Sequence, residues 1–277
     1  MLVDSPYVIK PGKRARLDRR ETGWAFDDHL KETGKETVRK KAAAVLDENR
    51  AELAQAQDIL YATASHAILV VLQAMDAGGK DGTIDHVFSG VNPQGCQVTS
   101  FKAPSHEELA HDYLWRIHKA TPPKGMIGIF NRSHYESVLV ERVRDIVPKK
   151  VWSKRYDHIN HFEKLLADEG TVILKFYLHI SKEEQKERLQ ARLDDPTKNW
   201  KFDVKDLEER RHWDAYTEAF EDALSKCSTE YAPWIVVPSD HKWFRNWVIS
   251  DAIVQALEKL DMQYPPPQPG IKDLVVE

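Results

Sequence analysis

Residues 70–82, with the sequence VVLQAMDAGGKDG, constrain the fold of this chain more than any other segment. An apolar run typical of a buried strand leads directly into a glycine-rich turn that carries one lysine, Lys80. Backbone N–H groups can surround a phosphate only where no Cβ atom blocks the approach, which explains Gly78 and Gly79. The lysine and the start of the following helix add positive charge. The segment therefore predicts a phosphate-binding loop between a strand and a helix.

Two positions depart from the P-loop spacing G-x-x-x-x-G-K-[ST]. Ala74 replaces the first glycine, and Asp81 replaces the hydroxyl residue that binds Mg²⁺. Asp76 adds a second carboxylate, and two carboxylates would repel bound phosphates unless Mg²⁺ lay between them. Asp76 is therefore the first candidate for holding a metal or orienting an acceptor, whereas Asp81 can simply favour the helix dipole or cap the turn. An ordinary glycine-containing turn remains an alternative for this segment alone.

The 277 residues can bury a substantial core, and one α/β domain with a helical insertion fits them better than two domains. Apolar runs predict strands at 67–75, 97–102, 126–130, 171–180 and 234–238, separated by helical patterns. This alternation predicts a mostly parallel sheet with helices on both faces. We expect an N-terminal arm at 1–36, the main domain at 37–262 and a proline-rich tail at 263–277.

Charge and cysteine content restrict the class of protein. A net charge of −4 gives no general case for nucleic acid binding, so any polyanion site must be local. The two cysteines have neither metal spacing nor a disulfide-rich context, and no apolar run approaches a membrane span. We therefore expect a cytoplasmic protein that binds neither nucleic acid nor membrane. The basic arm is expected to be solvated or to lie on a neighbouring subunit.

A second polar segment, NRSHYE at 131–136, leaves the strand at 126–130. Ligands of such sheets gather at the carboxyl ends of the strands, so this loop should lie near the first one. Asn131 stands where P-loop enzymes keep an acidic residue, so Glu136 or Asp76 must supply charge to a metal. Arg132 suits a fork-like grip on phosphate oxygens. The alternative is a capped helix start, with Ser133 paired to Glu136.

The third feature is a basic stretch at 181–202. Arg188 and Arg192 are four residues apart and share one face of a helix. A surface helix with internal ion pairs is the usual explanation of such a stretch. After a strand of a P-loop sheet, however, nucleotide-type kinases insert an arginine-bearing lid, and we expect a lid at about 181–213.

These segments together resemble the family-2 polyphosphate kinases. The similar motifs are MDAGGKDG at 75–82, NRSHYE at 131–136, INHFE at 159–163, the arginines at 188 and 192, and the stretch from 195 to 201. The resemblance implies a thymidylate-kinase-like P-loop core, a three-layer αβα sandwich with a helical lid. It also implies dependence on Mg²⁺, or on Mn²⁺ in its place. Asn131 and Glu136 depart from the common Asp-Arg-Ser-Trp-Tyr-Asn pattern and are similar to the class III branch, which accepts AMP as well as ADP.

The implied reaction is reversible transfer of the terminal phosphoryl group of inorganic polyphosphate to AMP or ADP, which yields ADP or ATP. The implied catalytic residues are Asp76, Lys80, Arg132 and Glu136, with Asp76 and Glu136 at the metal. The predicted nucleotide-binding residues are Asn131, Arg132, Tyr135 and Glu136. The predicted phosphate-binding residues are Ala77, Gly78, Gly79, Lys80, Asp81, Gly82, Arg188, Arg192, Lys198 and Lys201. An ATP-dependent nucleotide kinase and a non-catalytic binding module are the alternatives, and a homo-oligomer is expected.

Overall fold

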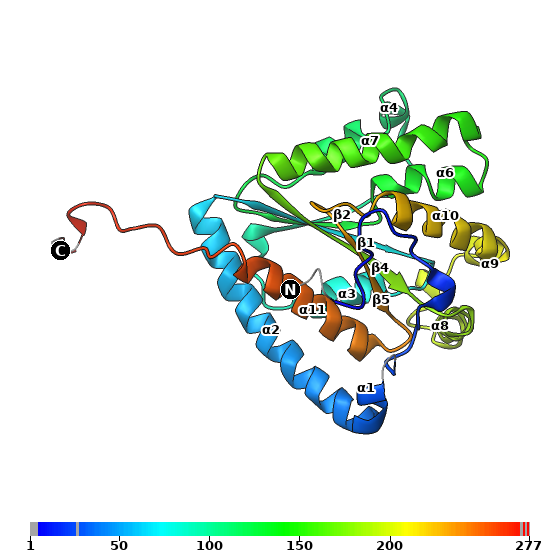
Figure 1. The fold of residues 1–277 in the computed structure, drawn as a ribbon, viewed down its shortest axis with the longest axis horizontal. Helices are drawn as coiled ribbons and strands as arrows, with labels where there is room; N and C mark the ends of the chain where they lie inside the picture. Colours follow the sequence, from blue (N-terminus) through cyan, green and yellow to red (C-terminus); the bar gives the residue numbers. More distant parts are fainter. Residues whose placement is uncertain (1–4, 26–27, 272–273, 275, 277) are drawn as a thin grey trace.

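A five-stranded parallel sheet forms the centre of the molecule (Figure 1). The computed structural model describes residues 5–25, 28–271, 274 and 276. The strands follow the order β2-β3-β1-β4-β5, and they are β1 Ala67–Ala74, β2 Cys96–Ser100, β3 Ile127–Asn131, β4 Thr171–His179 and β5 Trp234–Pro238. The predicted strands and their parallel arrangement are confirmed.

The register of the strands brings the two polar loops to one edge. Leu72 of β1 pairs with Asn131 of β3 and with Phe176 of β4. Every residue of β1 and β5 is buried, as expected for apolar strands covered on both faces. The loops that follow β1 and β3 therefore leave the sheet side by side.

Helices cover both faces of the sheet and complete the three-layer sandwich (Figure 1). One face packs against α2 Lys35–Thr63, α3 Lys80–Val87 and α11 Lys242–Glu258. The other face packs against α5 Trp115–Ala120, α6 Val140–Val143, α7 Lys149–Asp168 and α10 Trp213–Lys226. Leu46, Leu53 and Leu60, spaced seven residues apart on α2, are buried and belong to the core.

The shorter elements lie in the connections. A capping box formed by Ser105 and Glu108 begins α4 His106–Leu109. The basic stretch after β4 forms α8 Lys182–Asp194, η5 Asn199–Lys201 and α9 Lys205–Arg211. The remaining elements are η2 Leu17–Arg19, α1 Asp28–Thr33, η3 Pro93–Gly95 and η4 His134–Ser137. In the part of the chain that the structure describes, no helix is long and apolar enough to cross a membrane.

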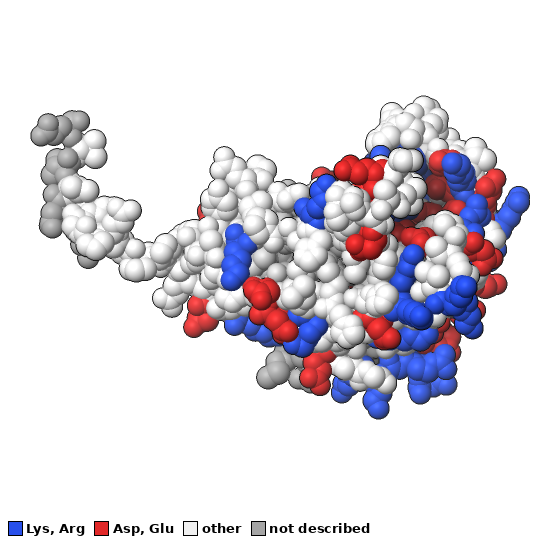
Figure 2. Space-filling model, turned by 90° about the horizontal axis from the view of Figure 1, so that it is seen from above, with Lys and Arg blue, Asp and Glu red and all other residues white. Residues whose placement is uncertain are grey.

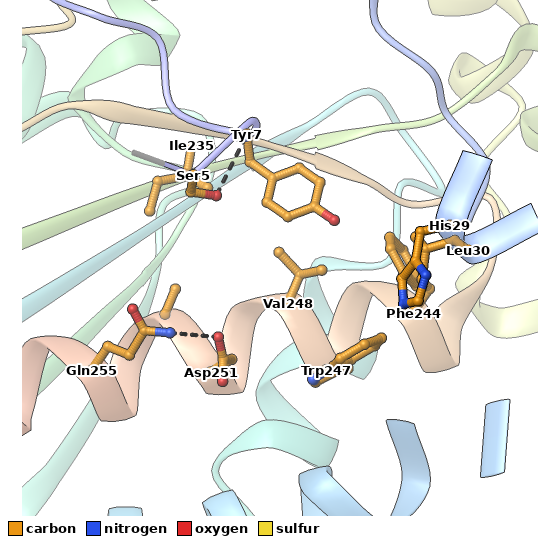
Figure 3. Close-up of a pocket in the computed structure, with 11 residues that line it drawn as sticks. Ser5, Tyr7, His29, Leu30, Ile235, Phe244, Trp247, Val248, Asp251 and Gln255 are labelled. Atoms are coloured by element: carbon orange, nitrogen blue, oxygen red, sulfur yellow. Dashed lines mark hydrogen bonds between the residues drawn. The ribbon is translucent and has the colours of Figure 1, made fainter. Parts of the chain in front are cut away.

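The N-terminal segment packs on its own chain, although its basic side chains at 13, 14, 16 and 19 are exposed, so the expected contact with a neighbouring subunit stays a prediction. Val8 forms an antiparallel bridge with Ile235 of β5, and Ile9 and Leu17 are buried. The backbone amides of Arg16 and Leu17 donate to the Glu221 carboxylate at 2.8 and 2.9 Å. The segment therefore lies on its own chain because its apolar residues cover the edge of β5. It leaves a small pocket against α11, lined by Tyr7, Trp247 and neighbouring residues (Figure 3).

Candidate active site

The P-loop, residues 75–80, joins β1 to α3 in a tight turn. Ala77 has a φ of 58° and Gly79 a φ of 99°, both in the left-handed region. A Cβ atom on Gly78 would lie 2.4 Å from the Ala74 Cβ, so only glycine fits there. Ala74 stands where the common P-loop pattern has glycine. Its methyl group fits there because the neighbouring residue, Gly78, has no side chain.

Lys80 is buried at the start of α3. Its Nζ lies 3.4 Å from the Ala74 carbonyl oxygen, which is its only hydrogen bond in the described part of the chain. Burial lowers the pKa of Lys80, as does nearby Arg132, whereas the carboxylates of Asp76, Glu136 and Asp81 oppose the shift. The ammonium group is therefore held inside the loop with donor capacity available for an anion.

The second loop lies against the P-loop, as predicted. Arg132, with a φ of 62°, donates from Nη2 to Asp76 Oδ1 at 3.0 Å, and its Nη1 lies 3.8 Å from Glu136 Oε2. Asn131 Nδ2 donates to Asp81 Oδ1 at 2.6 Å. Asp81 therefore accepts from Asn131, and its side chain does not cap α3. Both loops are fixed to each other by polar contacts between predicted site residues.

Glu136 lies in the site and is not the partner in a capping box. The Ser133 hydroxyl accepts from the Tyr135 amide at 3.2 Å and from Gln73 Nε2 at 3.0 Å. Burial raises the pKa of Glu136, while Arg132, Lys80 and a hydrogen bond with Gln73 lower it. Gln73 was missed from the sequence, although an amide inside the apolar run of β1 was a visible signal.

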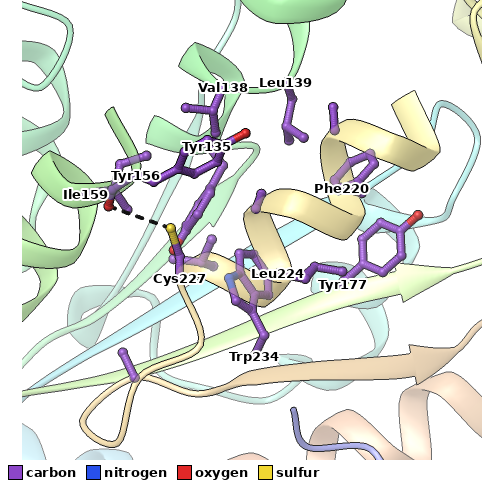
Figure 4. Packing of buried hydrophobic residues seen from close by; sticks show 14 of the residues in the cluster. Tyr135, Val138, Leu139, Tyr156, Ile159, Tyr177, Phe220, Leu224, Cys227 and Trp234 are labelled. Atoms are coloured by element: carbon purple, nitrogen blue, oxygen red, sulfur yellow. Dashed lines mark hydrogen bonds between the residues drawn. The ribbon is translucent and has the colours of Figure 1, made fainter. Parts of the chain in front are cut away.

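Tyr135 lies in the core and lines neither cavity described below, which revises its predicted contact with nucleotide (Figure 4). Its hydroxyl donates to Glu163 Oε1 at 2.8 Å and accepts from Lys175 Nζ at 2.9 Å. Lys175 also pairs with Glu163 Oε2 at 2.5 Å, and His134 Nε2 lies 3.0 Å from Glu163 Oε1. We call these four residues the Glu163 network. It anchors η4 to α7 and β4, and a lysine inside the apolar strand β4 was its sequence signal.

The basic stretch reaches the P-loop through one of its two arginines. Arg188 of α8 donates from Nη1 to the Ala77 carbonyl at 3.1 Å and from Nη2 to the Ser239 carbonyl at 2.5 Å. Its Nε pairs with Glu184. The Arg192 guanidinium instead pairs with Asp206 of α9 at 3.2 Å. The two arginines share a helix but not a binding partner.

The lysines of this stretch lie farther out. Lys198 pairs with Asp195 at 2.6 Å, and Lys201 lies over the Trp200 ring, which is 78% exposed. Figure 2 shows Lys and Arg interleaved with Asp and Glu at the end of the molecule opposite the C-terminal tail. The geometry thus leaves contact of Lys198 and Lys201 with phosphate as a prediction.

Two cavities meet at the second loop. The larger, about 760 Å³, lies among the second loop, α5 and α7 and is lined by Phe101, Arg116 and Arg155 among others. The smaller, about 370 Å³, lies between the P-loop and α9–α10 and includes Asp76. Arg132 and Glu136 line both cavities. A group bound in either cavity would therefore meet the same guanidinium and carboxylate.

Asp76 and Glu136 are also the candidate metal ligands. Both present carboxylate oxygens to the space around Arg132, and such oxygens suit Mg²⁺. Among the described residues no group of three or more His, Cys, Asp or Glu side chains is arranged to hold a metal. The donors fit an ion completed by phosphate oxygens and water, the usual mode for Mg²⁺ at phosphoryl-transfer sites.

The polyphosphate kinase 2 family model matches residues 36–265. The chain belongs to the polyphosphate kinase 2 family. The AMP/ADP-polyphosphate phosphotransferase of Meiothermus ruber is 54% identical over 271 residues, covering 98% of this chain and 99% of the relative. The ADP-polyphosphate phosphotransferase of Rhodopseudomonas palustris is 50% identical over 230 residues, covering 79% and 80%.

Solved structures agree with the sequence comparison. The polyphosphate kinase 2 of Arthrobacter aurescens TC1 superposes with a TM-score of 0.81 at 44% identity, covering 85% of each chain. The P-loop kinase fold predicted from the sequence is thereby confirmed, as is the resemblance to family-2 polyphosphate kinases. The chain is a kinase of this family, and the roles of its individual site residues remain predictions.

Proposed function

We propose that this chain transfers the terminal phosphoryl group of inorganic polyphosphate to AMP and ADP, reversibly and with Mg²⁺ or Mn²⁺. The observation that carries the proposal is the position of Arg132 and Glu136, which line both cavities beside the P-loop. A donor phosphate at the P-loop and an acceptor phosphate from the larger cavity would converge there. The names of the 54% and 50% identical relatives support these substrates.

The larger cavity suits the acceptor nucleotide. Its volume of about 760 Å³ lies in the range of small-molecule sites, and its wall combines apolar and cationic side chains. Phe101, Val140 and Val147 offer surface for a nucleoside, while Arg132 stands at the end nearest the P-loop. A nucleoside monophosphate would therefore enter with its phosphate toward Asp76.

The chemistry requires positioning and charge neutralisation. Phosphoryl transfer passes through a loose transition state whose charge is spread over oxygens, so no covalent nucleophile is needed. Lys80 and Arg132 supply positive charge on two sides of the P-loop opening. A Mg²⁺ ion held by Asp76 and Glu136 would neutralise the phosphate oxygens further.

The α8–α9 segment is proposed as the lid. Arg188 already contacts the Ala77 carbonyl, and the Arg192–Asp206 pair joins α8 to α9 above the smaller cavity. Lys198 and Lys201 are proposed to guide the polyphosphate chain, because their exposed position leaves them accessible to a long anion.

A donor screen tests the proposal. Purified protein is given AMP and Mg²⁺ with either polyphosphate or ATP as the only donor, and the nucleotides are separated and quantified. We expect ADP and ATP to form with polyphosphate alone. Turnover with ATP only would favour the nucleotide kinase, and binding of both ligands without product would identify a non-catalytic module.

A further inference from the structure

Arg245 of α11 is a buried cation with an unused donor. The residue is 1% exposed, and its Nε and Nη2 both donate to the Asn246 Oδ1 at 3.1 and 2.9 Å. Its Nη1 is buried and has no hydrogen-bond partner. Within the described ranges no carboxylate forms an ion pair with it. Proteins rarely bury a charge in this way without a functional reason.

The guanidinium lies directly against the P-loop. A Cβ atom built on Gly79 would lie 1.9 Å from Arg245 Nη1, and one built on Gly82 would lie 3.7 Å from Nη2. Gly79 therefore has two reasons to be glycine, its φ of 99° and the space that Arg245 occupies. The charge is placed behind the turn that should hold a phosphate.

A second guanidinium lies beside the first. The same Cβ position on Gly79 is 3.4 Å from Arg188 Nη1. Burial lowers the pKa of Arg245 to about 9, and the neighbouring Arg188 contributes to the shift. Two adjacent cations, one of them without a counter-charge, destabilise the folded protein when no anion is bound. An anion that binds nearby offsets their repulsion.

We propose that Arg245 is a positioning residue that supports phosphate binding from behind the P-loop. Its charge raises the positive potential at the loop amides, and its side chain sets the turn at Gly79. Arg245 need not contact the anion, since its Nη1 is enclosed by the loop. The inference rests on the proposed binding of polyphosphate at the P-loop.

Two variants separate charge from packing: Arg245→Met removes the charge and keeps a long side chain, and Arg245→Lys keeps the charge. Thermal unfolding is measured with and without tripolyphosphate, and KM is measured for polyphosphate and for AMP. We expect Arg245→Met to be at least as stable as the wild type without anion and to lose most of the stabilisation by tripolyphosphate. Its KM for polyphosphate should rise about tenfold, the size of one partly shielded charge interaction, while its KM for AMP changes little.

Arg245→Lys should keep most of the tripolyphosphate stabilisation and a KM for polyphosphate near that of the wild type. A merely structural arginine would give the opposite pattern, with Arg245→Met destabilised without anion but still stabilised by tripolyphosphate as much as the wild type. Equal losses in both variants would also overturn the role of charge. If the wild type failed to phosphorylate AMP, the proposed function would fail, whereas the unfolding measurements would still test Arg245.

Discussion

Arg132 combines a strained backbone with a bridging side chain. Its φ of 62° is uncommon outside glycine, and its guanidinium lies between Asp76 and Glu136. Strain of this kind persists where the surrounding contacts hold it, and it occurs often at functional sites. Here the Asp76 contact and the Glu163 network below the loop supply those contacts. The site is therefore held in shape before any substrate binds.

Glu136 should govern the use of AMP. AMP leaves a longer gap to the donor than the β-phosphate of ADP, and a carboxylate beside Arg132 could hold Mg²⁺ or its water in that gap. Glu136→Asn should therefore lower kcat/KM for AMP much more than for ADP under saturating polyphosphate. If the ratio of kcat/KM for AMP to kcat/KM for ADP were unchanged, residues other than Glu136 would determine the choice of acceptor.

The activity should depend on pH in a bell-shaped manner. Burial raises the pKa of Glu136, so its carboxylate is protonated at a higher pH than usual as the solution is acidified. Burial lowers the pKa of Lys80, so its charge is lost sooner than usual as the pH rises. If both charged forms are required, kcat/KM falls on each side. The Glu136→Gln variant should be slower, and its kcat/KM should no longer fall as the solution is acidified. If kcat/KM of the variant fell at acid pH as in the wild type, the fall would belong to another group.

At the scale of elements, α8 offers a matched comparison. Arg188→Ala removes contacts with the Ala77 and Ser239 carbonyls, whereas Arg192→Ala removes a contact with Asp206 inside the proposed lid. We expect Arg188→Ala to raise the KM for polyphosphate or lower kcat by roughly tenfold or more, and Arg192→Ala to do so less. Both effects should depend on salt. Exposed Lys186 on the same helix is the control, and wild-type kinetics in both arginine variants would make α8 a solvated helix.

The strands could be predicted because apolar runs bounded by turn residues have few other uses. β1 and β5 are buried along their whole length, and their order with the helices required a parallel sheet. The two loops could be placed together because they follow neighbouring strands. The position of the N-terminal segment could not be predicted, because its apolar residues contact Ile235 only in the folded chain.

The contacts of the candidate site that could not be predicted join residues that are distant in the sequence. Arg188 and Arg192 share one face of a helix, and their partners, the Ala77 carbonyl and Asp206, are distant in the sequence from that helix face. Arg245 likewise lies 166 residues from Gly79, the position against which it packs. No local pattern encodes such pairs. A charged residue inside an apolar strand or helix is the one local signal that they leave.

At the scale of the molecule, the Glu163 network joins layers of the fold. Glu163 and Lys175 are fully buried, and Glu163→Gln would leave the lysine without its counter-charge. Removing one partner of such a pair costs about 3–5 kcal/mol, which should appear in the free energy of unfolding by denaturant. Lys164→Ala, which breaks the exposed pair with Asp168 on the same helix, should cost about 1 kcal/mol or less. Equal effects of the two variants would contradict the importance of burial.

Properties of the whole protein that the fold does not decide stay predictions. These are a cytoplasmic location, a homo-oligomer, no binding to nucleic acid or membrane, and the boundaries of the arm, the main domain, the lid and the tail. The tail extends away from the rest of the molecule in Figure 1, consistent with few contacts to the sheet.

The most direct test is phosphoryl transfer from polyphosphate to AMP by the wild type and by Lys80→Ala, with Mg²⁺ present and ATP absent. Among the described residues the Lys80 ammonium is hydrogen-bonded only to the Ala74 carbonyl of the P-loop strand, so the variant should keep the wild-type fold by circular dichroism. We expect the wild type to produce ADP first and then ATP, and the variant to lose about a thousandfold in kcat, the scale of one lost transition-state charge contact. A wild type without product, or a variant that retains more than about a tenth of kcat, would contradict phosphoryl transfer at this loop.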